Sequence, residues 1–275
     1  GSRWLLEPFI ETDGCTLIFA DGGSAKSLFA LALAISIASG QGIVGRPSQA
    51  GMPVLYLDWE ASRETHAERM RAICKGADLE SLPPIFYRRQ HASLMESMAT
   101  IRKQIAQFNI GCVFVDSMGA ARGGEPESAD ITIRMFNAAR SFGVPWVGVD
   151  HITKNAPDKT KPFGSVYSHN LARATWQLQK NQKPGDRTLG AILTNHKANN
   201  GMILRPCAWQ LWFECERRCG DDRLTSVQFI ERDADDAMIA SGSGTAKNKI
   251  LQQLENGAKT IEQLAILLDL PKNQI

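Results

Sequence analysis

The sequence predicts an α/β protein with a mainly parallel central sheet, and three observations support this. Apolar runs of strand length alternate with helix-length segments between residues 15 and 150. A glycine-rich turn joins the first apolar run to a long apolar segment. Turn signals then punctuate the strand-like residues after 174. Near-continuous apolar strands separated by helices are typical of a parallel sheet covered on both faces.

The expected elements alternate along the chain. Strands are predicted at 15–19, 54–57, 84–87, 110–116 and 144–150, and helices at 28–39, 62–75, 93–108 and 128–142. The runs Lys-Pro-Gly-Asp at 183–186 and Asn-Asn-Gly at 199–201 are turn sequences that predict hairpins extending the sheet. The sheet core should therefore span about residues 4 to 235, within a domain of residues 1–239.

A second, smaller segment follows a linker. The run Ala-Ser-Gly-Ser-Gly at 240–244 predicts a flexible linker over 240–246. Residues 247–275 contain helical apolar patterns, and Thr260 with Gln263 forms a candidate capping box. This helical C-terminal segment resembles the first part of a winged helix-turn-helix, truncated where the recognition helix would begin. An ordinary helical hairpin explains the pattern equally well.

Composition excludes several classes of protein. The 275 residues are 43% hydrophobic, enough for one large core and a small second module. The net charge of +2 is nearly neutral, so any affinity for nucleic acid requires a local basic patch. Six cysteines without a C-x-x-C pair indicate reduced thiols and a cytoplasmic protein. No apolar stretch reaches the roughly 18 residues of a membrane helix, so no membrane partner is expected.

The glycine-rich turn, residues 20–27, reads Ala-Asp-Gly-Gly-Ser-Ala-Lys-Ser. A strand, such a turn and then a helix form a loop whose backbone N–H groups and helix N-terminus bind phosphates, which predicts ATP binding. Ala20 and Ala25 stand where glycines are expected, so Gly22 and Gly23 should supply the left-handed backbone freedom. A turn that binds nothing is the alternative. The predicted binding residues are Gly22, Gly23, Ser24, Ala25, Lys26, Ser27 and Leu28.

A magnesium site is expected beside this loop. Lys26 should neutralise the β- and γ-phosphates, and the Ser27 hydroxyl should ligate Mg²⁺. Asp116 ends an apolar run and should lie at the carboxyl edge of the sheet, where it would hold the metal shell. An acid in this position is also a common helix N-cap.

Two further side chains are candidates for the hydrolytic step. Glu60 follows the strand at 54–57 and is the preferred general base, with Asp58 as its rival. His151 ends the strand at 144–150 and should contact the γ-phosphate or the attacking water. A purely structural histidine remains the alternative.

In order and spacing, six segments over about residues 4 to 235 resemble the RecA-like P-loop ATPases of the plasmid and phage replicative-helicase type, related to the DnaB-like helicases. They are residues 20–27, 57–60, 114–117, 151–154, 164–165 followed by 171–173, and 196–201. The resemblance implies a magnesium-dependent ATPase that forms rings, typically hexamers, with ATP between subunits and single-stranded DNA in the channel. It also implies that Glu60 is the catalytic glutamate and His151 the γ-phosphate sensor.

The same resemblance suggests residues that act on a neighbouring subunit. Where DnaB-like helicases have K-x-R-N-G, this chain has Lys197 and, at the arginine position, Asn199. Lys197 is therefore the finger candidate, with Arg173 and Arg205 as further cations in trans. A solvated strand-end lysine is the alternative.

The polar stretch 153–168 includes Lys154, Lys159, Lys161 and Phe163 and is a candidate DNA-contacting loop. A merely solvated loop is the alternative. We therefore expect an oligomeric ATP-driven motor on single-stranded DNA, of the replicative helicase type. An ATP-switched DNA-binding or regulatory protein is the main alternative, and an ATPase acting on protein or RNA is another.

Overall fold

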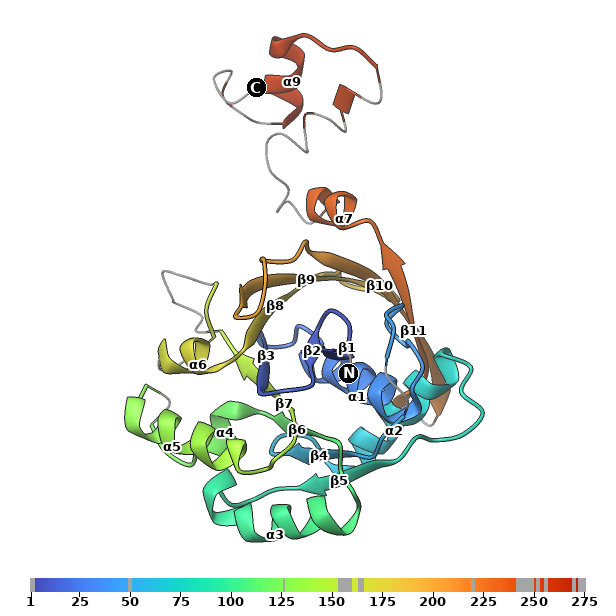
Figure 1. Ribbon diagram of the computed structural model, residues 1–275. Coiled ribbons are helices and arrows are strands. Elements are labelled where there is room, and N and C mark those ends of the chain that lie inside the picture. Colours follow the sequence, from blue (N-terminus) through green and yellow to red (C-terminus); the bar gives the residue numbers. More distant parts are fainter. Residues whose placement is uncertain are drawn as a thin grey trace.

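The computed structural model describes residues 3–48, 51–125, 127–152, 160–162, 166–218, 221–240, 250, 253–254, 257–268 and 271. Its main feature is a nine-stranded sheet in the order β11-β10-β9-β8-β3-β7-β6-β4-β5 (Figure 1). These strands are β3 (Cys15–Ala20), β4 (Val54–Asp58), β5 (Ile85–Arg89), β6 (Cys112–Asp116), β7 (Trp146–His151), β8 (Ala174–Asn181), β9 (Thr188–Ala198), β10 (Cys207–Arg218) and β11 (Asp221–Arg232).

The sheet is mainly parallel, as the sequence predicts. All neighbouring pairs from β8 through β3, β7, β6 and β4 to β5 are parallel. The pairs β8–β9 and β9–β10 are antiparallel, which makes them the hairpins expected from the turn sequences at 183–186 and 199–201. The pair β10–β11 is also antiparallel, but no turn sequence had predicted it. β1 (Trp4–Leu6) and β2 (Ile10–Glu11) form a separate two-stranded sheet that the sequence pattern did not indicate.

Helices cover both faces of the sheet. The described helices are α1 (Lys26–Ser39), α2 (Arg63–Gly76), α3 (Leu94–Gln107), α4 (Met118–Arg122), α5 (Ala129–Arg140), α6 (Val166–Leu171), α7 (Ala234–Ala240) and α9 (Ile261–Leu268). Serine N-caps begin three of them: Ser62, Ser93 and Ser128 each accept a hydrogen bond from a backbone N–H of the first turn. The short helices α4 and α6 were not expected from the sequence.

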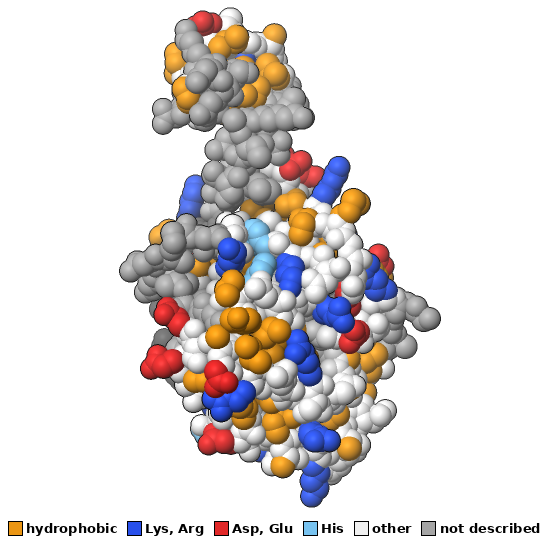
Figure 2. All heavy atoms as spheres, turned by 60° about the vertical axis from the view of Figure 1, so that its left-hand side comes forward, with side chains coloured by type: hydrophobic (Ala, Val, Ile, Leu, Met, Phe, Trp, Pro, Cys, Tyr) orange, Lys and Arg blue, Asp and Glu red, His pale blue; other side chains and the backbone are white. Residues whose placement is uncertain are grey.

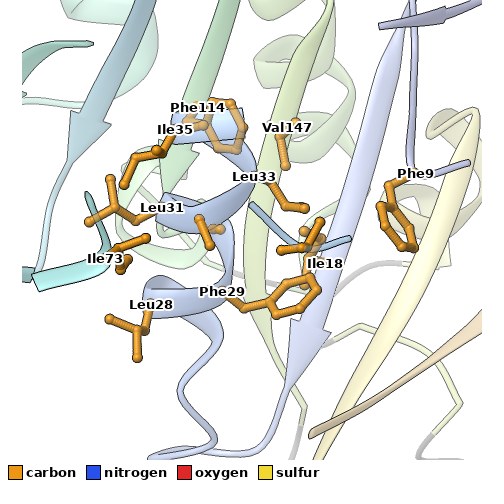
Figure 3. Close-up of a cluster of buried hydrophobic side chains, with 14 of the residues drawn as sticks. Phe9, Ile18, Leu28, Phe29, Leu31, Leu33, Ile35, Ile73, Phe114 and Val147 are labelled. Carbon is orange, nitrogen blue, oxygen red and sulfur yellow. The ribbon is translucent and has the colours of Figure 1, made fainter. Parts of the chain in front are cut away.

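Two apolar clusters pack on opposite faces of the sheet, because successive strand residues point to opposite sides. Phe114 of β6 belongs to the cluster around α1 and α2, whereas Val113 belongs to the cluster with α3, α4 and α5. Strands β8 to β11 curve around α1 (Figure 1). Figure 3 shows Phe29 and Leu33 of α1 among side chains from the strands, Ile18 and Val147.

This enclosure explains the composition of α1. Its residues from Leu28 to Ala38 are all buried, and Trp209 of β10 contacts Phe29 with ring centroids 5.1 Å apart. A helix that is apolar on every side must be enclosed. The helix that follows the glycine-rich turn is therefore held rigidly from all directions.

The structure describes part of the C-terminal region. Thr260 and Gln263 form the expected capping box before α9, with the Gln263 N–H donating to Thr260 Oγ1 at 3.2 Å. The predicted linker, apart from Ala240, and loop residues 153–159 and 163–165 lie outside the described residues. Within the described part of the chain, no helix combines the length and apolar character needed to cross a membrane.

Candidate active site

A pocket of about 600 Å³ opens at the carboxyl edge of the parallel strands. The register brings Ala20 beside His151 and Asp58 beside Asp116, so the ends of four strands meet there. Crevices at this edge are where open α/β sheets bind ligands. The lining residues are Gly23, Ser24, Ala25, Lys26, Ser27, Leu28, Asp58, Glu60, Ala61, Ser62, Thr65, Arg69, Asp116, His151, Phe213 and Leu224.

The glycine-rich turn needs a left-handed backbone at two positions. Gly23 has φ 69°, as expected, but the second position is Ala25, with φ 62°, and not Gly22. The expectation for Gly22 was therefore wrong: the chain makes its last turn into α1 at the N-cap, which is Ala25. For an alanine this conformation costs about 1–2 kcal/mol. Gly22 borders open space, because a methyl group added there would meet no other atom within 4 Å.

Two polar groups of the loop are ready for an anion. Lys26 is the first residue of α1, and its ammonium makes no hydrogen bond or ion pair with the described residues. Burial lowers the pKa of Lys26, while Glu60 and Asp116 oppose that shift. The buried Ser24 hydroxyl has no hydrogen-bond partner among the described residues. A buried polar group without a partner costs free energy, so a bound phosphate would relieve it.

Asp116 fits the role of a metal-shell ligand. The Tyr56 hydroxyl donates to Asp116 Oδ2 at 2.8 Å, whereas the buried Oδ1 has no hydrogen-bond partner in the described residues. Burial raises the pKa of Asp116 to about 6, and the hydroxyls of Tyr56 and Ser27 act against this shift. A buried carboxylate with one free oxygen beside a serine hydroxyl is the donor set that Mg²⁺ prefers.

Glu60 lies between two partners. Its Oε1 accepts a hydrogen bond from the Ser117 hydroxyl at 2.5 Å and lies 3.2 Å from His151 Nε2. These contacts, that of His151 first, lower the pKa of Glu60 to about 2. The carboxylate side chain remains 46% exposed, so a water molecule can reach it. Glu60 is therefore ionised at neutral pH and accessible from the pocket.

The rival acid, Asp58, is engaged in local structure. Its Oδ1 accepts hydrogen bonds from the backbone N–H groups of Glu60 and Ala61, both at 2.8 Å, and it lies 3.6 Å from Arg89 Nη1. Asp58 thus shapes the turn that carries Glu60. Asp58 is buried and already hydrogen-bonded, so Glu60 is the more accessible of the two acids.

Sequence reasoning missed five of the residues that line the pocket. Thr65 and Arg69 of α2 line the pocket together with its N-cap Ser62, at the spacing i, i+3 and i+7, which a helical projection could have revealed. Phe213 of β10 and Leu224 of β11 complete the wall, and the Leu224 N–H donates to Glu68 of α2 at 2.9 Å. No local signal marks these two residues, because they reach the pocket only through the curvature of the sheet.

Two of the predicted trans-acting cations, Lys197 and Arg173, lie at the opposite edge of the sheet. Lys197 Nζ donates to the backbone carbonyls of His169, Asn170 and Ala172, at 2.9, 2.6 and 2.7 Å. Arg173 lies 3.1 Å from Asp13, and both line a second pocket of about 530 Å³.

Comparison with known proteins gives the family and the fold. Residues 2–157, more than half of the chain, match the family described as AAA domain. A solved structure, the KaiC-like protein PH0186 from the hyperthermophilic archaeon Pyrococcus horikoshii OT3, is similar over 83% of this chain and 94% of that chain, with a TM-score of 0.55 and 14% identity. At this identity the likeness concerns the fold. No curated protein matches the chain. The chain belongs to the AAA domain family and is a P-loop ATPase with a RecA-like fold.

Proposed function

We propose that this ATPase is a magnesium-dependent, oligomeric motor that acts on single-stranded DNA, of the replicative helicase type. The observation that carries the hydrolytic part is the contact of Glu60 with Ser117 and His151, within the pocket that also holds Lys26 and Asp116. A protein that only bound ATP would need the phosphate loop but not an accessible carboxylate held toward it.

Each residue of the pocket would have a separate role in hydrolysis. The loop backbone and Lys26 would bind the phosphates, and Ser27 with Asp116 would hold Mg²⁺, which supplies charge neutralisation when bound. Glu60 would orient a water molecule toward the γ-phosphate and take up its proton. His151, already in contact with Glu60, would sense whether the γ-phosphate is present. Positioning and electrostatics supply most of the catalysis in such reactions.

Self-association is supported by where the cations lie. β3 has six residues, so its two ends are roughly 17 Å apart at about 3.3 Å per residue. Lys197 and Arg173 adjoin the amino end of β3, and the phosphate loop follows its carboxyl end. Arg173 could therefore contribute its charge only to the pocket of another copy, whereas the Lys197 ammonium is held by carbonyls of its own chain. Figure 2 shows an apolar patch on one face of the molecule, with Lys and Arg side chains mainly above and to the right of it and Asp and Glu side chains mainly to its left.

Single-stranded DNA as the substrate is supported by the resemblance in motif order and spacing. The hexameric ring, the role in DNA replication and the DNA-contacting loop at 153–168 remain predictions, and most of that loop lies outside the described residues.

ATP turnover measured with and without single-stranded DNA, for the wild type and Lys26→Ala, tests the motor. We expect DNA to stimulate turnover several-fold and Lys26→Ala to abolish it. Light scattering with a nonhydrolysable ATP analogue should detect a defined oligomer. An ATP turnover rate that single-stranded DNA leaves unchanged, but that RNA or a protein raises, would refute the proposal of a motor on DNA.

A second candidate is an ATP-switched DNA-binding or regulatory protein with weak turnover. The observation that favours it is the position of Lys197, whose ammonium is bonded to three carbonyls of its own chain, beside Asn199 in place of an arginine. In that case ATP would drive assembly, with tight nucleotide binding but little hydrolysis at saturating DNA.

A further inference from the structure

We propose that Arg122, which does not line the nucleotide pocket, is a positioning residue that holds His151 and, through it, Glu60. This inference rests on the proposed hydrolytic role of Glu60 and His151. It assigns a role to a buried ion pair on the far side of β7.

The ion pair joins three elements. Arg122, the last residue of α4, donates from Nη2 to Asp150 Oδ2 at 2.6 Å and to the Ser168 hydroxyl of α6 at 2.9 Å. All three residues have 0% exposure. The charge pair is therefore fully removed from water, where its hydrogen-bond geometry is maintained without competition from solvent.

Asp150 connects the ion pair to the candidate active site. Its second oxygen, Oδ1, accepts a hydrogen bond from the backbone N–H of His151 at 2.9 Å. The ring of His151 then reaches Glu60 Oε1 at 3.2 Å. One carboxylate thus bridges the guanidinium of Arg122 and the peptide group of the residue that touches the candidate base.

Stability alone is a poor explanation for this arginine. Its Nε and Nη1 are buried without hydrogen-bond partners in the described residues, which is a cost that an apolar side chain would avoid. Replacing a buried ion pair by apolar groups of similar volume is often neutral or stabilising. An apolar pair would lack the Asp150 carboxylate, which accepts a hydrogen bond from the backbone N–H of His151. Arg122 holds this carboxylate in the orientation that the hydrogen bond requires.

The consequence is specific to the chemical step. Among the described residues, Arg122 makes no hydrogen bond to a residue that lines the pocket, so its loss should leave ATP binding intact while the His151–Glu60 contact becomes looser. A displacement of about 1 Å in a catalytic arrangement can cost roughly a hundredfold in rate. We therefore expect Arg122→Met to lower kcat by about 10- to 100-fold, with KM for ATP changed less than twofold.

A double-mutant cycle in the full chain tests the route through His151. The variants are Arg122→Met, Arg122→Lys, His151→Ala and the two combinations with His151→Ala. If Arg122 acts through His151, its substitution causes no further loss of kcat in the His151→Ala background. Arg122→Lys keeps the charge and should recover part of kcat. If Arg122→Met does not fold, Arg122→Lys enters the same cycle.

Equal losses of kcat in both backgrounds would overturn the inference, as would a rise in KM that accounts for the whole effect. A second measurement does not need turnover: the NMR signal of the His151 ring, assigned by its absence in His151→Ala, should shift in the Arg122 variants. An unchanged ring signal would overturn the inference. If the wild-type protein hydrolyses no ATP, the proposed function fails, and the ring signal still decides the role of Arg122.

Discussion

Asp116→Asn should stabilise the protein in the absence of metal and nucleotide while abolishing its use of Mg²⁺. Asp116 is 2% exposed and carries one oxygen without a hydrogen-bond partner in the described residues. Asparagine has nearly the same shape, so its Oδ1 can still accept the Tyr56 hydroxyl, but it carries no charge. The substitution therefore removes a buried charge and leaves the packing in place.

The pKa shift gives the size of the effect. Burial raises the pKa of Asp116 from 3.8 to about 6, so the folded protein disfavours the ionised form by about two pKa units. At 1.36 kcal/mol per unit, the ionised carboxylate costs at most about 3 kcal/mol. Because the folded pKa is above the unfolded one, this cost is absent below pH 4, grows between pH 4 and 6, and is complete above pH 6.

Urea unfolding at pH 4 and pH 8, without Mg²⁺ or nucleotide, measures this difference. We expect Asp116→Asn to exceed the wild type in free energy of unfolding by about 2–3 kcal/mol at pH 8 and to equal it near pH 4. Glu60→Gln is the matched control. Its carboxylate is stabilised by His151 and Ser117, so this variant should gain nothing at pH 8. A wild type more stable than Asp116→Asn at pH 8 would refute the reasoning.

Three further outcomes are expected. Ala25→Gly removes the left-handed strain at the N-cap of α1 and should raise the free energy of unfolding by up to about 1 kcal/mol; a loss of stability in a urea titration would contradict this. Burial lowers the pKa of His66 from 6.5 to about 4. The unfolded chain therefore takes up a proton at a higher pH than the folded protein, and the folded protein becomes less stable as the pH falls below 6.5. Relative to His66→Phe, the free energy of unfolding of the wild type should fall by about 2 kcal/mol between pH 7 and 5. Parallel pH profiles of the two proteins would contradict this pKa shift of His66. Phe213→Ala should weaken binding of a fluorescent ATP analogue several-fold but leave inorganic triphosphate binding unchanged, because Phe213 is an aromatic pocket residue that comes from β10 and not from the phosphate loop; equal losses for both ligands would contradict a contact with the base.

The carboxyl edge of the sheet was predictable because its residues follow from local rules. Apolar runs predict the parallel strands, and a parallel register then brings Asp58, Asp116 and His151 to one edge. Phe213 and Leu224 were not predictable, since the curvature of β8 to β11 around α1 brings them to the pocket. The left-handed position at Ala25 was also missed, because alanine is a poor signal for that conformation.

Several unfavourable features of this chain meet at the pocket, although others, such as the buried Arg122, lie outside it. Ala25 is strained, Ser24 and Asp116 each bury an oxygen without a hydrogen-bond partner in the described residues, and Lys26 is partly desolvated beside them. Elsewhere α1 satisfies every expectation for a buried helix. Folding alone would not retain such costs at one place, but a bound Mg²⁺–triphosphate would relieve most of them together. The stability that these groups cost the protein without ligand should therefore return as binding free energy, which is why removing the charge of Asp116 should stabilise the protein and disable it in the same step.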